Sequence, residues 1–405
     1  MADPNDDLSK PAGAGVSRNV IVMGTVSFLN DLSSDMIFPF IPVFLTSVLG
    51  APVAFVGIVE GVADATASIL KMVSGRYADI LRRRKPFIVG GYALSALAKP
   101  LLAFAAAPWH VLAVRFIDRT GKGMRDAPRD ALLSMSTEKQ SVGRAFGFHR
   151  AADTLGAAAG PMVAFLLLPW LGNDLRMLFL FSFVASFVAV VILQIFVRDR
   201  IQTREAGPVA RAQNISYGSL GAPFYIFLVA AVVLALGRAS DAFLILRAQD
   251  VGIALALLPL PYVLSNLVFS AFSMPVGSLS DRIGHRNTFM IGIVLLSVVY
   301  MLFARAHSLV ALWTLFALYG CAHAFLEGVG RAIVADLVAE GARGTAYGLY
   351  NACTGIALLP ASVLFGFLWQ YSGFATAFIY SATLGGASFC IFLFLRLRYR
   401  RMNHI

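Results

Sequence analysis

The feature that most constrains this chain is a succession of apolar segments, each long enough to cross a lipid bilayer. A membrane-spanning helix needs about 20 mostly apolar residues. Such segments lie at 19–48, 53–76, 86–106, 109–132, 144–169, 175–197, 219–246, 254–278, 287–304, 308–335, 344–370 and 374–396. The composition agrees, because 58% of the residues are hydrophobic and only 14% are charged. The sequence therefore predicts an all-α polytopic membrane protein with twelve transmembrane helices.

The basic residues of the predicted loops gather in every second loop and at the C-terminal end. The members of these clusters are Arg82, Arg83, Arg84, Lys85, Lys139, Arg144, Arg198, Arg200, Arg204, Arg211, Arg282, Arg286, Arg343, Arg396, Arg398, Arg400 and Arg401. Cytoplasmic loops carry the excess of Lys and Arg, so we expect both termini in the cytoplasm of a cell with this chain in its inner membrane. The net charge of +11 is then a topology signal and not a sign of nucleic-acid binding.

The chain repeats itself. The stretch "GRYADILRRRK" at 75–85 recurs as "GSLSDRIGHR" at 277–286, and "GRAFGFHRAADT" at 143–154 matches "GTAYGLYNACTG" at 344–355. We therefore predict two pseudo-symmetric six-helix halves. The expected parts are a polar N-terminal tail without a secretory signal, a first half, a charged cytoplasmic linker, a second half and a basic tail, at 1–18, 19–197, 198–218, 219–396 and 397–405.

The loop "GSLSDRIGHR" resembles a signature of the major facilitator superfamily, Gly-x-x-x-Asp-Arg-x-Gly-x-Arg, which lies between the second and third helices of a half. The first copy has Ile80 where the family usually has Arg. Small residues permit close helix packing, and the carboxylates and arginines can pair across the cytoplasmic seam. An ordinary loop with topology-setting arginines is the alternative. We assign gating to Gly75, Asp79, Arg83, Gly277, Asp281, Arg282 and Arg286.

The fifth predicted helix resembles a pattern of the superfamily's proton-coupled antiporters, Gly-x8-Gly-x3-Gly-Pro-x2-Gly-Gly. Its matching positions are Gly147, Gly156, Gly160 and Pro161, whereas Ala164 and Phe165 depart from the last two glycines. A face of small residues packs tightly, and a proline can kink the helix. The pattern favours export, and the alternative is a tightly packed helix without directional meaning.

The fourth predicted helix carries an unusual density of charge in "VRFIDRTGKGMRDAPRD" at 114–130. At about 100° per residue its eight ionisable side chains fall within roughly 140° of the helix circumference. A charge at the centre of a lipid-facing helix costs at least about 2.5 to 3.5 kcal/mol. We therefore expect this face to meet partners and to line a polar path between the two halves.

These charges and those of the other helices give the candidate site residues. Acidic pairs one turn apart should resist simultaneous ionisation, which suits proton coupling. Arg115 resembles the fourth-helix Arg of the family's antiporters, in Leu-x-x-x-Arg-x-x-x-Gly, but Arg119 replaces the final Gly. Any single member could instead belong to a structural ion-pair network. We assign proton coupling to Asp31, Asp35, Glu60, Asp64, Arg115, His149 and Asp153, and substrate binding to Asp118, Arg119, Lys122, Arg125, Arg238, Asp241, Glu327 and Arg331.

The resemblance implies a secondary active transporter that works by alternating access. A proton-coupled exporter of a small organic solute leads, and a proton-coupled importer of an organic anion or a metal chelate such as a siderophore is second. A polytopic membrane enzyme is a remote third, because no nucleophile elbow, HExxH, phosphate loop or dinucleotide fingerprint accompanies His149 and Asp153. We expect no enzymatic activity, metal site, cofactor or nucleic-acid partner. The expected partners are the solute, protons and the lipid bilayer, and the expected state is a monomer.

Overall fold

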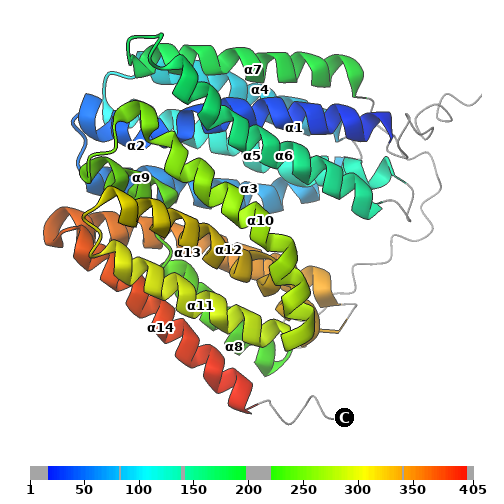
Figure 1. The fold of residues 1–405 in the computed structure, drawn as a ribbon. Coiled ribbons are helices and arrows are strands. Elements are labelled where there is room, and N and C mark those ends of the chain that lie inside the picture. The colour runs from blue at the N-terminus through cyan, green and yellow to red at the C-terminus, as the bar shows by residue number, and fades with distance from the viewer. Residues whose placement is uncertain (1–16, 82–83, 138–141, 198–219, 340–341, 399–405) are drawn as a thin grey trace, which may run out of the picture. The chain divides into compact units, whose positions relative to one another are not determined.

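The computed structural model describes residues 17–81, 84–137, 142–197, 220–339 and 342–398. Throughout these ranges the regular structure is helical and no strand occurs (Figure 1). The prediction of an all-α protein is therefore confirmed. The linker 198–218, Arg83 and nearly all of the two predicted tails lie outside the described residues.

The first half of the chain runs through six spans, two of which contain short irregular turns. They are α1 (Arg18–Ile37) with η2 (Phe38–Phe40), α2 (Ile41–Val43) and η3 (Phe44–Val48); α3 (Val53–Leu81); α4 (Lys85–Leu101) with η4 (Leu102–Phe104); α5 (Pro108–Met135); α6 (Val142–Leu167); and α7 (Leu175–Phe196).

The second half repeats the plan. Its spans are α8 (Gly221–Leu236) with α9 (Asp241–Asp250); η7 (Leu255–Leu257) with α10 (Pro259–Ile283); α11 (His285–Phe303); α12 (Leu309–Leu337); α13 (Arg343–Ser372); and α14 (Phe374–Arg398).

Ten of the spans formed by the described residues are long and apolar enough to cross a membrane. The other two, α5 and α6, have 28 and 26 residues, which is ample length, but α5 holds the charged stretch and α6 holds Arg144, His149, Arg150 and Asp153. Their polarity, not their length, separates them from the rest. A hydropathy measure thus omits two long helices because of their charged residues.

The spans expected over 19–48 and 219–246 are present as Arg18–Val48 and Gly221–Asp250, but neither is a regular α-helix throughout. Helix α1 ends at Ile37, where Pro39 and Pro42 follow, and proline supplies no backbone N–H to continue the ladder. In the seventh span the chain leaves the helix after Leu236 and starts again at Asp241, with the Ser240 hydroxyl accepting from the Ala242 N–H at 3.4 Å. Arg238 therefore lies in a break and not on a helix.

The contacts divide the chain into two compact units. Unit 1 comprises 1–50, 66–205 and 255–260, and unit 2 comprises 51–65, 206–254 and 261–405. In unit 1, α1 packs on α6 and α7, and α4 packs on α5 and α7; in unit 2, α8 packs on α13 and α14, and α11 packs on α12 and α14. Each pairing of one unit has its counterpart in the other. The predicted pseudo-symmetry of two six-helix halves is confirmed.

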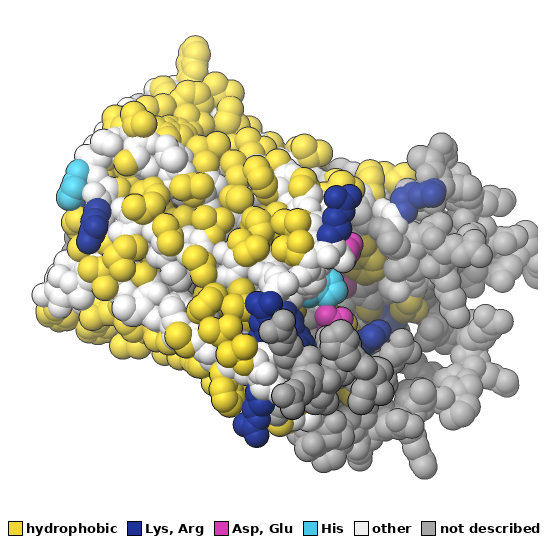
Figure 2. All heavy atoms as spheres, turned by 60° about the horizontal axis from the view of Figure 1, so that its bottom comes forward, with side chains coloured by type: hydrophobic (Ala, Val, Ile, Leu, Met, Phe, Trp, Pro, Cys, Tyr) yellow, Lys and Arg dark blue, Asp and Glu magenta, His cyan; other side chains and the backbone are white. Residues whose placement is uncertain are grey.

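Hydrophobic side chains cover most of the described surface on the face drawn in Figure 2, and most of the Lys, Arg, Asp, Glu and His side chains visible on it lie toward one end. Many large apolar side chains are exposed, among them Leu166, Val184, Phe187, Ile195 and Phe394. In water such a surface would aggregate, whereas lipid tails solvate it. The surface therefore fits a bilayer environment.

Candidate functional site

The charged face of α5 is largely buried inside unit 1. Arg115 and Arg125 are each only 4% exposed, and Lys122 is the exposed member of the face. Asp118 lies 3.9 Å from Arg115 Nη1 and 3.7 Å from Arg119 Nε. More than two turns further along, Arg129 pairs with Asp126 at 3.7 Å and with Asp130 at 3.0 Å. Carboxylates and guanidiniums of one helix thus partly neutralise one another, as a lipid-embedded cluster requires.

Helix α1 brings the carboxylates of Asp31 and Asp35 to this face. Both side chains are half-buried, and the Asn30 Nδ2 donates to Asp31 Oδ1 at 3.0 Å. Lys122 acts electrostatically on both carboxylates, Arg125 acts on Asp31, and Arg119 acts on Asp35. Within unit 1 the predicted acidic pair of the first span therefore lies within electrostatic range of the predicted basic face of the fourth.

Helix α4 supplies two residues that the sequence analysis missed. The Lys99 ammonium is 2% exposed and donates to Ser33 Oγ at 2.9 Å and to the Asn30 carbonyl at 3.4 Å, both on α1. One turn earlier, Ser95 accepts from Arg125 Nη1 at 2.8 Å and donates to the Asp118 carbonyl at 2.9 Å. Helix α4 thus connects α1 with α5. A lysine inside an apolar segment was the available signal, since an intramembrane charge is a functional candidate by default.

Helix α6 adds His149 and Asp153 to the same cluster. His149 Nδ1 lies 3.5 Å from Asp153 Oδ2, and His149 is 4% exposed. Among the described residues, His149 Nε2 and Asp153 Oδ1 have no hydrogen-bond partner although both atoms are buried. Asp153 also acts electrostatically on Asp31. The pair is placed where a proton could be held, because each residue retains an unused polar atom.

Two other predicted proton-coupling residues, Glu60 and Asp64, lie in the part of α3 that belongs to unit 2. Glu60 is buried, and Asp64 acts electrostatically on Asp241. A side chain on Gly57 or Gly61 would collide with backbone of α13 at Ser362 or Leu359, so the start of α3 packs closely on that helix.

A cavity of about 190 Å³ inside unit 2 is lined by three of the four substrate-binding residues predicted in the second half, Arg238, Glu327 and Arg331. The Arg238 Nη2 lies 3.3 Å from His323 Nδ1, and the Tyr319 hydroxyl donates to Asp241 Oδ1 at 2.7 Å beside the cavity. The walls combine both signs of charge with apolar and hydroxyl groups. The lining residues are Ala231, Leu234, Ala235, Arg238, Phe289, Leu296, His323, Leu326, Glu327, Arg331, Tyr350, Asn351 and Thr354.

The glycines of the two motifs differ in how closely they pack against neighbouring helices. Close packing is confirmed at Gly156 and Gly160, where an added Cβ would collide with backbone of α1 at Phe28 and Leu32. It is also confirmed at Gly75, whose Cβ would lie 3.1 Å from that of Ala127 on α5. At Gly147 a Cβ would meet open space, so this glycine is not needed for packing in this conformation. Pro161 lies inside α6, which continues past it.

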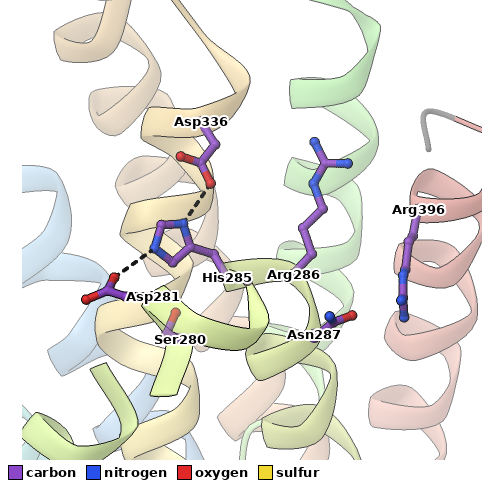
Figure 3. A pocket seen from close by; sticks show the side chains of 8 residues that line it. Ser280, Asp281, His285, Arg286, Asn287, Asp336 and Arg396 are labelled. Atoms are coloured by element: carbon purple, nitrogen blue, oxygen red, sulfur yellow. Dashed lines mark hydrogen bonds and ion pairs between the residues drawn. The ribbon is translucent and has the colours of Figure 1, made fainter. Parts of the chain in front are cut away.

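The packing role assigned to Gly277 is wrong in this conformation, because a Cβ there would also meet open space. In the same loop, Asp281 pairs with His285 Nε2 at 3.6 Å and not with Arg282 or Arg286 (Figure 3). His285 Nδ1 lies 2.7 Å from Asp336 Oδ2 at the end of α12. We expected a carboxylate–arginine pair in this loop, but the structure instead has His285 between the carboxylates of Asp281 and Asp336. In the first-half copy, Arg83 and the Asp79 side chain lie outside the described residues.

No group of three or more His, Cys, Asp or Glu side chains that could hold a metal ion occurs within the described ranges. Cys321, Cys353 and Cys390 are free thiols. The site chemistry available in the described part of the chain is therefore that of ion pairs, hydrogen bonds and protons.

Comparison with known proteins identifies the family. The family model described as Major Facilitator Superfamily matches residues 23–246 and 214–404. An uncharacterised MFS-type transporter of Methanocaldococcus jannaschii is 35% identical over 401 residues, which cover 98% of this chain and 99% of that protein. The multi-drug resistance efflux pump PmrA of Streptococcus pneumoniae is 24% identical over 296 residues, covering 70% of this chain and 72% of its own.

A crystal structure of the nucleoside transporter NupG has the same fold. It aligns with a TM-score of 0.78 at 16% identity and covers 93% of this chain and 98% of its own. The repeated six-helix halves, the bilayer-length apolar spans and the full-length match agree, and the chain belongs to the Major Facilitator Superfamily of multi-pass membrane transporters.

Proposed function

We propose that this transporter exports a small organic solute in exchange for protons, by alternating access. The proposal depends on one observation within unit 1: Asp31 and Asp35 on α1 lie within electrostatic range of the cationic face of α5. Charges this far inside a bilayer protein are expensive to retain without a use. A pair of carboxylates beside Lys and Arg side chains can bind a proton when the cations are distant and release it when they are close.

The coupling step rests on the distance between these cations and the carboxylates. When Lys122 and Arg119 approach, they stabilise the ionised forms of Asp31 and Asp35, and a proton leaves. When a conformational change draws the cations away, the carboxylates lose this counter-charge and a proton returns. Exchange requires that solute bind in the conformation that has released the proton and leave before the proton binds again. In this proposal Arg115, His149 and Asp153 pass or hold the proton.

The solute class follows from the cavity in unit 2. Arg238 and Arg331 offer two cationic groups, Glu327 offers an anionic group, and Phe289 and the leucines offer apolar wall. A small zwitterionic or amphipathic organic anion would use all three kinds of contact. We assign recognition of its charged groups to Arg238, Asp241, Glu327 and Arg331 in this unit, and to Asp118, Arg119, Lys122 and Arg125 on α5.

Two observations favour export over import. The relative PmrA is called an efflux pump, and α6 carries most of the glycine pattern that resembles antiporters. Import of an organic anion or a metal chelate is the second candidate, because the Arg238 and Arg331 pair suits carboxylates in either direction.

Proton-driven export can be tested in inverted membrane vesicles that contain the protein in excess. Respiration acidifies the vesicle interior, and acridine fluorescence reports the gradient. A transported solute added outside should exchange for internal protons and restore fluorescence, and radiolabelled solute should accumulate. Accumulation only in right-side-out vesicles would instead establish import. Absence of both signals across zwitterions, organic anions, cationic dyes and siderophores would refute proton-coupled transport of these classes.

The proposal includes an orientation in the inner membrane with both termini cytoplasmic and a monomeric protein. Single cysteines placed at 77–85, 198–215 or 282–287 should react with an impermeant thiol reagent from the cytoplasmic side, and cysteines replacing Gly50 or Ala107 should react from the other. The reverse labelling pattern would invert the direction assigned to every transport assay.

A further inference from the structure

The described part of the chain holds a second polar pocket, which includes two residues assigned to gating, Asp281 and Arg286, and shares no residue with the solute and proton sites proposed above. It has a volume of about 660 Å³ and is lined by Ser280, Asp281, Gly284, His285, Arg286, Asn287, Asp336 and Arg396. It lies at the turn that joins α10 to α11, beside the last turn of α14 (Figure 3). Both α10 and α11 have bilayer-crossing length and composition, so the turn between them lies at the membrane surface.

The two sides of this pocket differ in charge. On one side, the His285 imidazole lies between two carboxylates. Its Nε2 is 3.6 Å from Asp281 Oδ1, and its Nδ1 is 2.7 Å from Asp336 Oδ2. On the other side, Figure 3 shows Arg286 of α11 and Arg396 of α14 apart from these carboxylates. Within the described residues Arg286 makes no ion pair or hydrogen bond, and Arg396 makes a weak contact, from Nη1 to Met290 Sδ at 3.8 Å. Among the described residues, neither of these two half-buried guanidiniums makes an ion pair.

Two further groups at the pocket are able to donate to an anion. The Ser280 hydroxyl is buried, with the residue only 3% exposed, and it has no hydrogen-bond partner among the described residues. Helix α11 starts after Gly284, which has φ +89° and no side chain to cap the first turn. The free N–H groups of that turn carry the positive end of the helix dipole. Guanidiniums, a hydroxyl and a helix start are the donors that phosphate oxygens accept.

We propose that this pocket binds the phosphate headgroup of an anionic phospholipid. The membrane-surface location supplies the headgroup at high local concentration, and exposed apolar side chains of the same helices, Ile291, Phe394 and Leu397, offer a surface for the acyl chains. The lipid phosphate neutralises Arg286 and Arg396 and so ties the start of α11 to the end of α14. A soluble phosphate would satisfy the guanidiniums but would leave the apolar surface unused.

Native mass spectrometry of the delipidated full-length protein tests this site, with phosphatidylglycerol and phosphatidylcholine of matched chains as probes. We expect saturable binding of one phosphatidylglycerol and much weaker binding of phosphatidylcholine. Each basic residue near an anionic surface contributes about fivefold in affinity, so the double variant Arg286→Gln, Arg396→Gln should bind about 25-fold more weakly. Arg398→Gln is the matched control, since this exposed arginine of the same helix end does not line the pocket. It should change the affinity by less than about twofold.

Ser280→Ala tests the pocket without removing charge, and a loss of about threefold is expected for one neutral donor. Size-exclusion profiles in detergent identify variants that fail to fold, and Ser280→Ala keeps the test informative if the double variant is one of them. Unchanged phosphatidylglycerol affinity in the folded double variant, or in Ser280→Ala, would overturn the site. Equal binding of phosphatidylcholine would show that anionic charge is not read, and displacement by equimolar inorganic phosphate would refute a lipid occupant.

Discussion

The two units repeat one helix arrangement but carry very different charge. In unit 1, the charged face of α5 carries eight ionisable side chains and α4 buries Lys99. In unit 2, the corresponding α12 carries His323, Glu327, Arg331 and Asp336, and the run from Phe289 to Phe303 on α11 contains no Lys, Arg, Asp, Glu or His. A shared backbone plan therefore does not bring a shared electrostatic environment.

This difference suggests a division of labour between the halves. Unit 1 has paired carboxylates with several cations in reach, which suits the storage and release of protons. Unit 2 has a defined cavity with few charges of both signs, which suits recognition of the charged groups of a solute, a role that the proposal also gives in part to α5 of unit 1. Each of the following variants changes one unit, and the measurement shows whether the function assigned to the other unit is retained.

The largest effect is expected from the acidic pair of unit 1. The double variant Asp31→Asn, Asp35→Asn should lose uphill transport driven by a pH gradient, down to the level of protein-free liposomes, because no carboxylate remains to carry the exchanged proton. Solute-for-solute exchange should persist. Asp241→Asn in unit 2 is the comparison, and it should weaken solute binding while keeping proton coupling. Normal uphill accumulation by the double variant would move the coupling site to Asp153 or Glu60.

The next effect concerns the cavity of unit 2. Arg238→Gln removes a guanidinium that contacts His323 and faces the cavity. A hydrogen bond to a charged group contributes about 1.5 to 3 kcal/mol, so the KM for an anionic solute should rise by at least about tenfold. The number of protons exchanged per solute should stay unchanged. A change in that ratio with an unchanged KM would reverse the roles given to the two units.

Helix packing differs between the units at repeat-related positions. Gly156 and Gly160 of α6 touch the backbone of α1, whereas the positions that match them on α13 are Ala357 and Ala361. Gly160→Ala should therefore destabilise unit 1 by about 1 to 3 kcal/mol through overpacking, seen as a lower Tm in detergent. Gly147→Ala, placed in open space, is the control and should leave the Tm unchanged or raise it. Equal Tm values for the two variants would contradict the close approach of α6 to α1.

The smallest effect is expected at Lys99, whose place on α4 has no charged counterpart on α11. Lys99→Met removes the ammonium but nearly keeps the side-chain length and the apolar stem, so the packing around this position is retained. The protein should fold, and gradient-driven transport should slow by about fivefold as a counter-charge of Asp35 is lost. Lys99→Arg should retain more of the rate, because it keeps the charge. A methionine variant as fast as the parent would make Lys99 a purely structural residue.

Much of the fold could be read from the chain alone. Bilayer thickness sets the length of an apolar helix, so the twelve spans were predictable, and the two repeated motifs indicated two related halves. The charged face of α5 was predictable as well, because helical periodicity places its eight ionisable residues on one side and lipid excludes them. The breaks at Pro39 and near Ser240 carried proline and capping signals that a hydropathy reading averages away.

The interaction partners of the charged residues could not be predicted from the sequence. The sequence by itself determined that this is a multi-pass membrane protein with intramembrane charges, since hydrophobicity and period are local properties. Only the tertiary structure decided that Lys99 donates to α1, that Ser95 joins α4 to α5, and that Asp281 pairs with His285 instead of an arginine. Such contacts depend on how separate helices pack, and a distance between helices is not encoded by spacing along any one of them.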